Sequence, residues 1–291
     1  MSTNRRTFVK KIAAGSAGLA LGSWSAGLAA KNYRNISGAN DRINVAIMGV
    51  KSRGGQLARV FGRAKDARVA CICDVDAQVL DATTLMVQEE YGYLPEAEAD
   101  VRKVLENKDV DALVIAAPDH WHAPASIMAM QAGKHVYVEK PCGHNPQEGE
   151  WLIEAQERYG KVLQMGNQQR SSDENIEIIR EIRSGLIGET YEAIAWYANS
   201  RGSIGTGKKV AVPEWLDWEL WQGPAPRQDY RDNLVHYNWH WFWSTGNGDL
   251  NNQGTHQLDV ARWALDADQT HPVRAMAIGG RFKWDDQGET P

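Results

Sequence analysis

The stretch Ile43-Asn44-Val45-Ala46-Ile47-Met48-Gly49 leads directly into Val50-Lys51-Ser52-Arg53-Gly54-Gly55. Its first part is an apolar run of strand length that ends in glycine, and its second part is a glycine-containing turn. A helical pattern through Leu57, Val60 and Phe61 follows. Strand, turn and helix in this order are typical of a site for a dinucleotide pyrophosphate, because a helix begins with free N–H groups.

The glycines of this turn predict two different roles. Gly49 permits the tight turn, and Gly54 lets the helix pack close to the strand. Lys51 occupies the place of the usual second glycine, so either the loop stands slightly off the cofactor or Lys51 itself meets a phosphate. We expect these residues and Arg53 to lie against the cofactor.

A second apolar strand over 68–73 ends at Asp74. An acidic residue at this distance from the glycines accepts hydrogen bonds from the ribose hydroxyls of NAD and repels the extra phosphate of NADP. The alternative for Asp74 is a strand-end turn or a helix cap before Asp76. The turn that precedes it favours the cofactor role, so NAD is the expected cofactor and NADP the alternative.

Strands and helices go on alternating through the first half of the chain. Apolar runs predict strands over 111–116, 135–138 and 161–165, with helices over 126–131 and 151–158. The fold class is therefore α/β, with a doubly wound parallel sheet of the Rossmann type over 42–166. Polar clusters follow the last three strands, where such sheets bind ligands: Pro118 to His122, Glu139 to Pro141, and Gly166 to Arg170.

Two of these stretches carry a family resemblance. The runs from Ala116 to His122 and from Gly133 to Pro141, with their Glu-Lys-Pro motif, resemble the glucose–fructose oxidoreductase and inositol dehydrogenase family (Gfo/Idh/MocA). The resemblance extends from about Asn44 to Gly280. It implies a Rossmann domain followed by an α+β domain with an open, mostly antiparallel sheet. It also implies hydride transfer between NAD(P) and a hydroxyl carbon of a sugar, cyclitol or related polyol.

The resemblance assigns roles at the strand ends. It implies that Lys140 touches the reacting hydroxyl and the nicotinamide ribose, where an ammonium stabilises the developing alkoxide. Pro141 is a candidate for a cis peptide. The neighbouring residues expected to bind the cofactor are Pro118, Asp119, His122 and Glu139.

The second half, 167–291, is predicted to be the substrate domain. Its pattern indicates a helix over 175–184, a strand over 190–198, a tryptophan-rich loop over 200–248 and a strand over 274–280. Aromatic faces in such a loop suit sugar rings, although most of these tryptophans individually fit a core or interface role better. Family members continue with more strands, so we expect the chain to be truncated.

A helix predicted over 249–265 carries the second catalytic group. Asn252, His256, Asp259 and Trp263 share one face by their spacing. The resemblance implies that His256 accepts the hydroxyl proton and that an aspartate stands four residues earlier. Asn252 replaces that aspartate here, so either Asp249 or Asp259 compensates, or proton abstraction differs. The residues expected to contact substrate are Asn167, Arg170, Trp239 and Asp259.

Composition excludes several function classes. A net charge of −5 provides no basic surface for nucleic acid. Three cysteines do not form a disulfide framework or a zinc site, and Cys71 and Cys73 are expected to be buried thiols on one side of a strand. His120 and His122 lie two apart without a carboxylate–histidine helix motif, so no metal site is expected.

The first residues predict export. Residues 1–30 contain the pair Arg5-Arg6, a short apolar stretch and a small-residue end, which resembles a twin-arginine signal; a disordered basic tail is the alternative. Residues 31–41 indicate a linker. We expect a periplasmic protein without a stable membrane anchor, carried folded by the Tat export machinery with NAD tightly bound. A homo-oligomer is expected as well.

Three functions fit the sequence. The leading interpretation is an NAD(P)-dependent dehydrogenase acting on a sugar or cyclitol. The second uses a resident cofactor without net redox, as in epimerisation or glycoside cleavage through a transient ketone. The third is a cofactor-bound binding protein without turnover, against which the intact Glu139-Lys140-Pro141 motif and His256 argue.

Overall fold

The computed structural model describes residues 42–199, 201–267 and 270–291. The signal predicted over 1–30 and the linker over 31–41 lie outside these residues. Within the described part of the chain, no helix is long and apolar enough to cross a membrane.

The first half contains a six-stranded sheet in which every adjacent pair of strands is parallel. The order β3-β2-β1-β4-β5-β6 is that of the doubly wound Rossmann sheet, as predicted. The strands are β1 (Ile43–Met48), β2 (Ala67–Cys73), β3 (Glu96–Glu98), β4 (Ala112–Ile115), β5 (His135–Glu139) and β6 (Leu163–Gly166). The short edge strand β3 was not predicted, because its sequence Glu-Ala-Glu has no apolar run.

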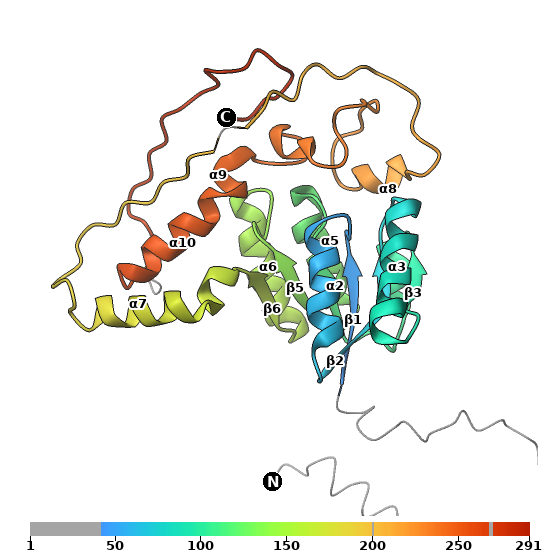
Figure 1. Ribbon diagram of the computed structural model, residues 1–291, viewed down its shortest axis with the longest axis horizontal. Coiled ribbons are helices and arrows are strands. Elements are labelled where there is room, and N and C mark those ends of the chain that lie inside the picture. Colours follow the sequence, from blue (N-terminus) through green and yellow to red (C-terminus); the bar gives the residue numbers. More distant parts are fainter. Residues whose placement is uncertain (1–41, 200, 268–269) are drawn as a thin grey trace, which may run out of the picture. The chain divides into compact units, whose positions relative to one another are not determined.

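Helices cover both faces of the sheet (Figure 1). One face packs on α2 (Arg53–Arg63) and α3 (Ala77–Tyr91), through a core with Ile47 and Ile72 at its centre. The other face packs on three helices: α4 (Val101–Glu106), α5 (Asp119–Gln131) and α6 (Pro146–Tyr159). Cys71 and Cys73 are buried free thiols on that second face, which confirms the expectation that they point the same way.

Helix α5 begins earlier than predicted. The predicted start was residue 126, whereas the helix runs from Asp119 with Pro118 as its N-cap. Polar residues of the first turn concealed the start, because the apolar pattern begins only at Ala123. A carboxylate in the first turn interacts favourably with the helix dipole. The cluster from Pro118 to His122 is therefore held on a helix at the carboxyl end of β4.

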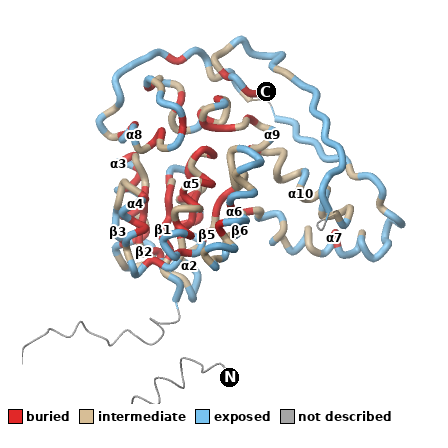
Figure 2. Tube along the Cα trace, turned by 180° about the vertical axis from the view of Figure 1, so that it is seen from behind, coloured by how far each residue is buried: buried red, intermediate tan, exposed pale blue. Residues whose placement is uncertain are grey.

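Two strands predicted in the second half are wrong. Segments 190–198 and 274–280 are extended, and neither forms a ladder with any described residue. A strand needs a paired neighbour, and apolar alternation alone does not supply one. Both segments are largely exposed in Figure 2, with Ile194 73% and Met276 83% exposed. The helix predicted over 175–184 is confirmed as α7 (Asp173–Arg183).

The helix predicted over 249–265 is two helices. They are α9 (Gly248–Asn252) and α10 (Gly254–Ala264), separated at Gln253. The local sequence Asn-Asn-Gln-Gly contains poor helix formers, so the break has a local cause. Asn252 and His256 therefore lie on different helices, and the predicted common face is wrong for this pair. Helix α10 packs beside α7 (Figure 1), where the Arg183 side chain donates to the Trp263 carbonyl.

The tryptophan-rich loop (201–247) folds beyond the carboxyl ends of the strands. It contains α8 (Trp218–Gln222) and the short 3₁₀ helix η3 (Asn238–Trp241). Its apolar cluster holds several of the tryptophans in a small core, as expected for most of them. The members of this cluster are Leu216, Trp218, Trp221, Tyr230, Leu234, Trp239 and Phe242.

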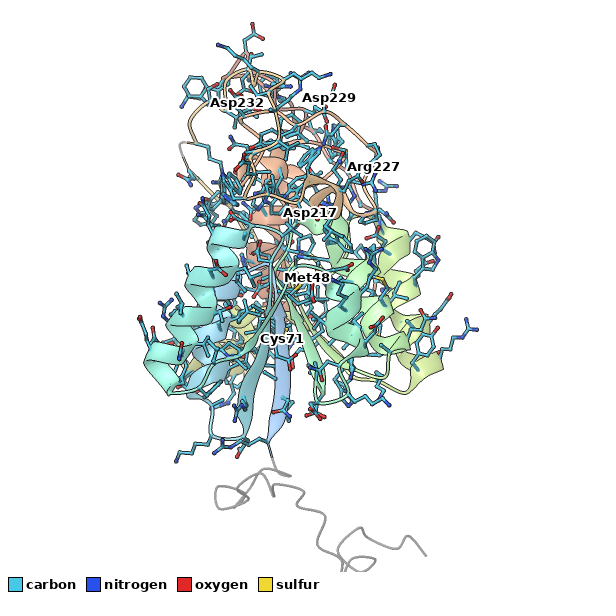
Figure 3. The ribbon with its side chains drawn as sticks, turned by 90° about the vertical axis from the view of Figure 1, so that its right-hand side faces the viewer. Met48, Cys71, Asp217, Arg227, Asp229 and Asp232 are labelled. Atoms are coloured by element: carbon cyan, nitrogen blue, oxygen red, sulfur yellow. The ribbon has the colours of Figure 1, made fainter. Side chains whose placement is uncertain are left out.

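This loop is joined to the sheet domain by backbone pairing. The Ala77 amide donates to the Trp215 carbonyl at 2.9 Å, and the Asp217 amide donates to the Val75 carbonyl at 2.9 Å. Asp76 and Leu216 thereby form an antiparallel bridge. Figure 3 shows Asp217 beyond the end of β1 marked by Met48, with Arg227 farther out. The loop is thus fixed directly over the residues that follow β2.

Candidate functional site

The turn after β1 has the geometry of a phosphate-binding turn. Gly49 has φ +81°, and a Cβ there would lie 2.7 Å from the Ala117 backbone. A Cβ at Gly54 would lie 1.9 Å from the Gly49 carbonyl oxygen. Only glycine fits at either position, which agrees with the roles predicted for the turn and for close helix packing.

The start of α2 faces the same space. Ser52, its N-cap, makes no side-chain capping bond, so the first amides of the helix are open to an anion. Lys51 is exposed and lines the cavity described below, at the place of the missing second glycine. Its contact with a phosphate remains a prediction.

Asp74 stands at the end of β2 and closes the turn. Its carboxylate accepts from the Val50 amide at 2.7 Å and from the Asp76 amide at 3.0 Å. Burial raises the pKa of Asp74 above its ordinary value. Each carboxylate oxygen has a second lone pair, so ribose hydroxyls can still bind. The structural and cofactor roles of Asp74 are compatible, and the latter remains a prediction.

Glu139 and Arg53 form an ion pair across the turn. The Arg53 Nε donates to Glu139 Oε1 at 2.8 Å, and the Tyr137 hydroxyl lies 3.4 Å from the same oxygen. Glu139 is buried and Arg53 is one-third exposed. The pair links the start of α2 to the end of β5, so both predicted cofactor residues also hold the site together.

Lys140 connects the two halves of the chain. The Lys140–Pro141 peptide is cis, which confirms the expectation for Pro141. The Lys140 ammonium donates to the backbone carbonyl of Asn252 at 2.7 Å and to its Oδ1 at 3.0 Å. Burial lowers the pKa of Lys140, while the nearby carboxylates of Asp119 and Glu139 act in the opposite direction.

The first turn of α5 supports Lys140 from the other side. Burial raises the pKa of Asp119 to about 7, against the charge of Lys140 and a hydrogen bond from Asn247. His122 is buried with Nδ1 2.5 Å from the Pro141 carbonyl and Nε2 2.7 Å from the Ala117 carbonyl. Both imidazole nitrogens are therefore engaged with backbone, and His122 supports the Pro141 segment.

These residues line a cavity of about 460 Å³ between the sheet domain and the tryptophan-rich loop. Many of the predicted site residues line this cavity, and they lie at or beyond the ends of β1, β2, β4 and β5 or belong to the second half of the chain. They are Gly49, Lys51, Arg53, Asp74, Pro118, Asp119, His122, Glu139, Lys140, Trp239 and Asn252. A cavity of this size, with charged groups converging on one wall, is typical of a ligand site.

His256 lies outside the lining of this cavity. It is at the start of α10, and its Nδ1 is buried without a hydrogen-bond partner among the described residues. Burial lowers its pKa, and the charge of Lys140 acts in the same direction. Its role as proton acceptor remains a prediction.

Neither aspartate forms a hydrogen bond with the His256 ring in the described part of the chain. Asp249 pairs with Arg201 and accepts from the Asn252 side chain at 3.2 Å. Asp259 pairs with Arg170 through two contacts of 2.9 and 2.8 Å. The aspartate missing at 252 is therefore not replaced at the imidazole; instead, Asn252 holds Lys140.

The other predicted substrate residues lie apart from the cavity lining. Arg170 pairs with Asp259 and stands 5.1 Å over the Trp263 ring. Asn167 has its Oδ1 buried without a partner among the residues that the structure describes. Substrate contacts by these residues remain predictions, whereas Trp239 does line the cavity.

Several cavity residues were missed by sequence reasoning. His236 pairs with buried Asp76 at 3.1 Å and stacks on Trp215 at 5.6 Å. His240 stacks on Trp239 at 3.6 Å and also lines the cavity. The sequence offered only one hint, namely that His240 lies between two tryptophans in a long loop. No fixed residue spacing marks such a pattern as a site. Across the described residues, no group of three potential metal ligands is found.

Two family models match the chain. Residues 43–167 match the oxidoreductase family with an NAD-binding Rossmann fold, and residues 189–286 match the C-terminal alpha/beta domain of the same oxidoreductases. The chain belongs to the Gfo/Idh/MocA oxidoreductase family. The resemblance seen in the Glu-Lys-Pro motif is thereby confirmed, and NAD is the cofactor type of the family.

Curated relatives in this family carry a glycosidase name. A "Glycosyl hydrolase family 109 protein" of Saccharopolyspora erythraea is 28% identical over 227 residues, which are 73% of this chain and 49% of the relative. A "Glycosyl hydrolase family 109 protein 2" of Shewanella sp. (strain ANA-3) is 32% identical over 162 residues, which are 54% of this chain and 35% of the relative. The chain thus spans between about a third and a half of the length of these Gfo/Idh/MocA relatives.

Solved structures share the fold. GenD2 from gentamicin A biosynthesis, in complex with NAD, matches with a TM-score of 0.54 and 19% identity, covering 78% of this chain and 54% of GenD2. A putative myo-inositol dehydrogenase from Sinorhizobium meliloti matches with a TM-score of 0.52 and 18% identity, covering 77% of this chain and 55% of that protein. These matches support the two-domain Gfo/Idh/MocA architecture.

The residues of this chain fit NAD. The turn at Gly49, the open start of α2 and the carboxylate of Asp74 lie around one cavity, and Gly54 packs behind Gly49 outside its lining. In this order they match a pyrophosphate and an adenosine ribose. Lys140 lines the same cavity.

Proposed function

We propose that this protein is an NAD-dependent oxidoreductase that moves hydride to or from a hydroxyl carbon of a sugar, cyclitol or related polyol. One observation carries the proposal: a single cavity contains both the dinucleotide turn and the ammonium of Lys140. The turn binds the dinucleotide. A buried ammonium stabilises an oxygen on which negative charge develops during the reaction.

The chain's own residues account for the polarisation of that oxygen. NAD, when bound, accepts or returns the hydride. The Lys140 ammonium has three N–H donors, and two of them bind oxygens of Asn252. The third N–H can therefore donate to a substrate oxygen. Asp119 and Glu139 balance its charge from the sheet side. The lysine therefore meets the reacting oxygen in a fixed position, without reorganisation during the reaction.

The test begins with protein purified without added cofactor. The protein is denatured and the supernatant assayed for NAD(H) and NADP(H); we expect stoichiometric NAD(H). The protein is then mixed with myo-inositol, scyllo-inositol, glucose and N-acetylgalactosamine, and reduction of the nicotinamide is followed by absorbance. Reduction by any of them supports the function and rules out a binding protein without turnover. No reduction, with or without added NAD, contradicts it.

A second candidate is glycoside cleavage without net redox. It is supported by the curated relatives, whose names are those of glycosyl hydrolases. Transient oxidation of a ring hydroxyl to a ketone acidifies the neighbouring C–H bond, so a leaving group on the next carbon is eliminated. Release of nitrophenol from a nitrophenyl glycoside, with deuterium entering the sugar from heavy water and no net NADH, distinguishes this candidate from the dehydrogenase.

We also propose export through the twin-arginine pathway into the periplasm. Support comes from the sequence of residues 1–30, with Arg5-Arg6 and a weakly hydrophobic stretch. A folded-protein route allows NAD to be bound before export. Fusion of residues 1–30 to a fluorescent protein should direct fluorescence to the periplasm, and Arg5→Lys with Arg6→Lys should abolish it. Cytoplasmic retention of the unaltered fusion would contradict the assignment.

Association into a homo-oligomer is part of the same proposal. Its support is the set of large apolar side chains exposed on the extended segments, Trp196 and Ile278 among them. Light scattering on the purified protein measures the molar mass directly. A mass equal to one chain at all concentrations would contradict the proposal.

A further inference from the structure

The end of the cavity near Asp74 is lined by both halves of the chain. Asp74 follows β2 and Ala99 follows β3, which are neighbouring strands of the sheet. The tryptophan-rich loop adds Leu216 and His236 to the same lining. The bridge between Asp76 and Leu216 sets the loop against the residues that follow β2. An adenosine ribose bound at Asp74 therefore lies next to the loop.

His236 brings a polar group from the loop to this end of the cavity. The charges that act on its ring are those of Lys51 and Asp76, from the turn after β1 and the start of α3. His240 also comes from the loop, but the charge of Lys140 acts on its ring, so it borders the part of the cavity near that lysine. Of these two histidines, His236 is therefore the one beside the ribose position.

Two contacts fix the position of the His236 ring. Its Nε2 lies 3.1 Å from Oδ2 of Asp76, and the ring stacks on Trp215 with the ring centroids 5.6 Å apart. Asp76 is itself buried and caps α3 through Oδ1, so the helix fixes the carboxylate that holds the imidazole. The Asp76 amide also donates to the Asp74 carboxylate at 3.0 Å. The imidazole and the predicted ribose acceptor are thus joined through one residue.

The two ring nitrogens of His236 are in different states. An ionised carboxylate only accepts, so the ring proton is assigned to Nε2, which faces Asp76. Nδ1 then carries a lone pair, and no residue in the described ranges forms a hydrogen bond to it. Burial lowers the pKa of His236, and the charge of Lys51 acts in the same direction against that of Asp76. The ring is therefore neutral at neutral pH, and its Nδ1 is an acceptor available to a ligand.

We propose that His236 is a further cofactor-binding residue, whose Nδ1 accepts a hydrogen bond from a hydroxyl of the adenosine ribose. The inference rests on the proposed function, in which the cavity binds NAD. The adenosine ribose of NAD carries two hydroxyls, so one can donate to Asp74 and the other to His236. The cofactor is then bound between the sheet domain and the tryptophan-rich loop, with one acceptor on each.

The same arrangement favours NAD over NADP. In NADP a 2′-phosphate replaces one of the two hydroxyls, so one donor to these acceptors is lost. A neutral imidazole whose proton is held by Asp76 has no N–H left to offer that phosphate. The phosphate charge would also lie beside the carboxylates of Asp74 and Asp76, which repel it. His236 therefore adds to the discrimination that Asp74 provides from the sheet domain.

The test measures whether His236 and the ribose hydroxyls act on each other. The full chain, freed of bound dinucleotide by dialysis, is titrated with ADP and with 2′,3′-dideoxyadenosine diphosphate, which lacks both hydroxyls. The titrations are repeated with His236→Phe, which keeps an aromatic ring for the stack on Trp215 and removes Nδ1. We expect loss of the hydroxyls to weaken binding by about 3–10-fold more in the wild type than in this variant. His271→Phe, at an exposed histidine, is the matched control and should behave as the wild type.

The comparison separates a ribose contact from a change in the shape of the loop. Any loss of loop structure in His236→Phe weakens both ligands by the same factor and cancels in the ratio of their affinities. Equal ratios in the wild type and in His236→Phe would therefore overturn the proposal. Asp74→Ala is the positive control, because the predicted ribose acceptor should show the same coupling. Coupling at His236 without oxidation of any polyol would instead overturn the dehydrogenase function and keep the ribose contact.

Discussion

The Lys140 ammonium donates at once to the backbone carbonyl and to the side-chain oxygen of Asn252. These residues come from the end of β5 and from the end of α9, so the contact joins the sheet domain to the second half of the chain. Asn252 in turn donates to Asp249, which pairs with Arg201. Asn252 stands where the family resemblance implies an aspartate. Its side chain therefore contacts Lys140 and does not contact the His256 imidazole.

Replacing Lys140 by Met should abolish most turnover while NAD still binds. Loss of a single donor to a developing oxyanion typically costs about 10²–10³-fold in kcat. Steady-state kinetics and cofactor titration measure the two effects separately. Lys161→Met, at the amino end of β6 and away from the cavity, is the control. Comparable activity in the two variants would remove Lys140 from the reaction.

Replacing Asp74 by Ala should weaken NAD binding and relax discrimination against NADP. The ribose hydroxyls lose a charged acceptor, which costs about 1.5–3 kcal/mol or 10–100-fold in affinity. Fluorescence titration with both dinucleotides measures the change, and Asp81→Ala on the exposed side of α3 is the control. An unchanged preference would refute the ribose assignment. A modest loss of stability is expected as well, because the Val50 amide loses its acceptor.

Adding one methyl group at Gly54 should separate α2 from β1. The new Cβ would lie 1.9 Å from the Gly49 carbonyl, so the helix has to move. Gly54→Ala should therefore lose NAD binding and unfold at lower urea. Gly149→Ala is the matched control, because its Cβ meets nothing within 4 Å and it lies inside α6. That variant should gain about 0.5–1 kcal/mol from helix propensity. Equal effects of the two changes would contradict the packing role.

Stability should depend on pH through Asp119. Its pKa is raised by burial from 3.8 to about 7, so the folded state binds the proton more tightly than the unfolded state. The contribution to stability is then present below 3.8 and is lost as pH rises to about 7. His120 and His240, lowered by burial from 6.5 to about 4, act oppositely: their contribution is present above 6.5 and is lost as pH falls.

Asp119→Asn isolates the carboxyl from the histidines. Relative to wild type, the variant should gain free energy of unfolding as pH rises through this window, since the wild type alone loses the proton. Urea unfolding at about pH 5 and about pH 8 measures the difference. A variant whose advantage is the same at both pH values would show that Asp119 does not titrate in the window. Asp81→Asn serves as the control.

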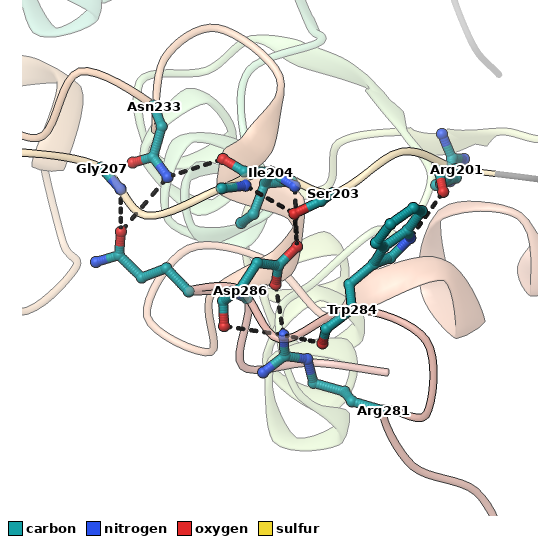
Figure 4. A network of polar contacts seen from close by, with 11 residues as sticks. Arg201, Ser203, Ile204, Gly207, Asn233, Arg281, Trp284 and Asp286 are labelled. Carbon is teal, nitrogen blue, oxygen red and sulfur yellow. Dashed lines mark hydrogen bonds and ion pairs between the residues drawn. The ribbon is translucent and has the colours of Figure 1, made fainter.

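The C-terminal segment should stabilise the loop that carries His240. Asp286 accepts from the Ile204 amide and the Ser203 hydroxyl, each at 2.9 Å, and also pairs with Arg281 (Figure 4). The Trp284 indole donates to the Arg201 carbonyl at 2.9 Å. Asp286→Ala leaves the Ile204 amide and the Ser203 hydroxyl without this acceptor, so the free energy of unfolding should fall by about 1–3 kcal/mol. Thermal unfolding should show a lower midpoint, whereas exposed Asp285→Ala should match the wild type.

The sheet domain was predictable because its information is local. Each buried parallel strand is a continuous apolar run, and each run ends where a polar cluster begins, as at Cys73-Asp74 and Val138-Glu139. Because the strands are parallel, their carboxyl ends lie at one edge of the sheet, and no long-range contact has to be known to place them there. Gly49, Asp74 and Lys140 follow three such strands and line one cavity, as their places at the strand ends predict.

The second half was less predictable because its contacts are long-range. The alternation over 190–198 signals a strand but not a partner, and none pairs with it among the described residues. The contact of Asn252 with Lys140 joins residues 112 positions apart, and periodicity does not encode it. His240 was missed because its place on the cavity wall follows from the folding of an irregular loop.

The bridge between Asp76 and Leu216 has a consequence for biosynthesis. The phosphate-binding turn is encoded near the beginning of the chain, but one wall of the cavity is supplied by residues that leave the ribosome much later. A nascent chain that has emerged only to the end of β6 has the turn and lacks the wall. We therefore expect the cavity to enclose a dinucleotide only after the tryptophan-rich loop has been translated.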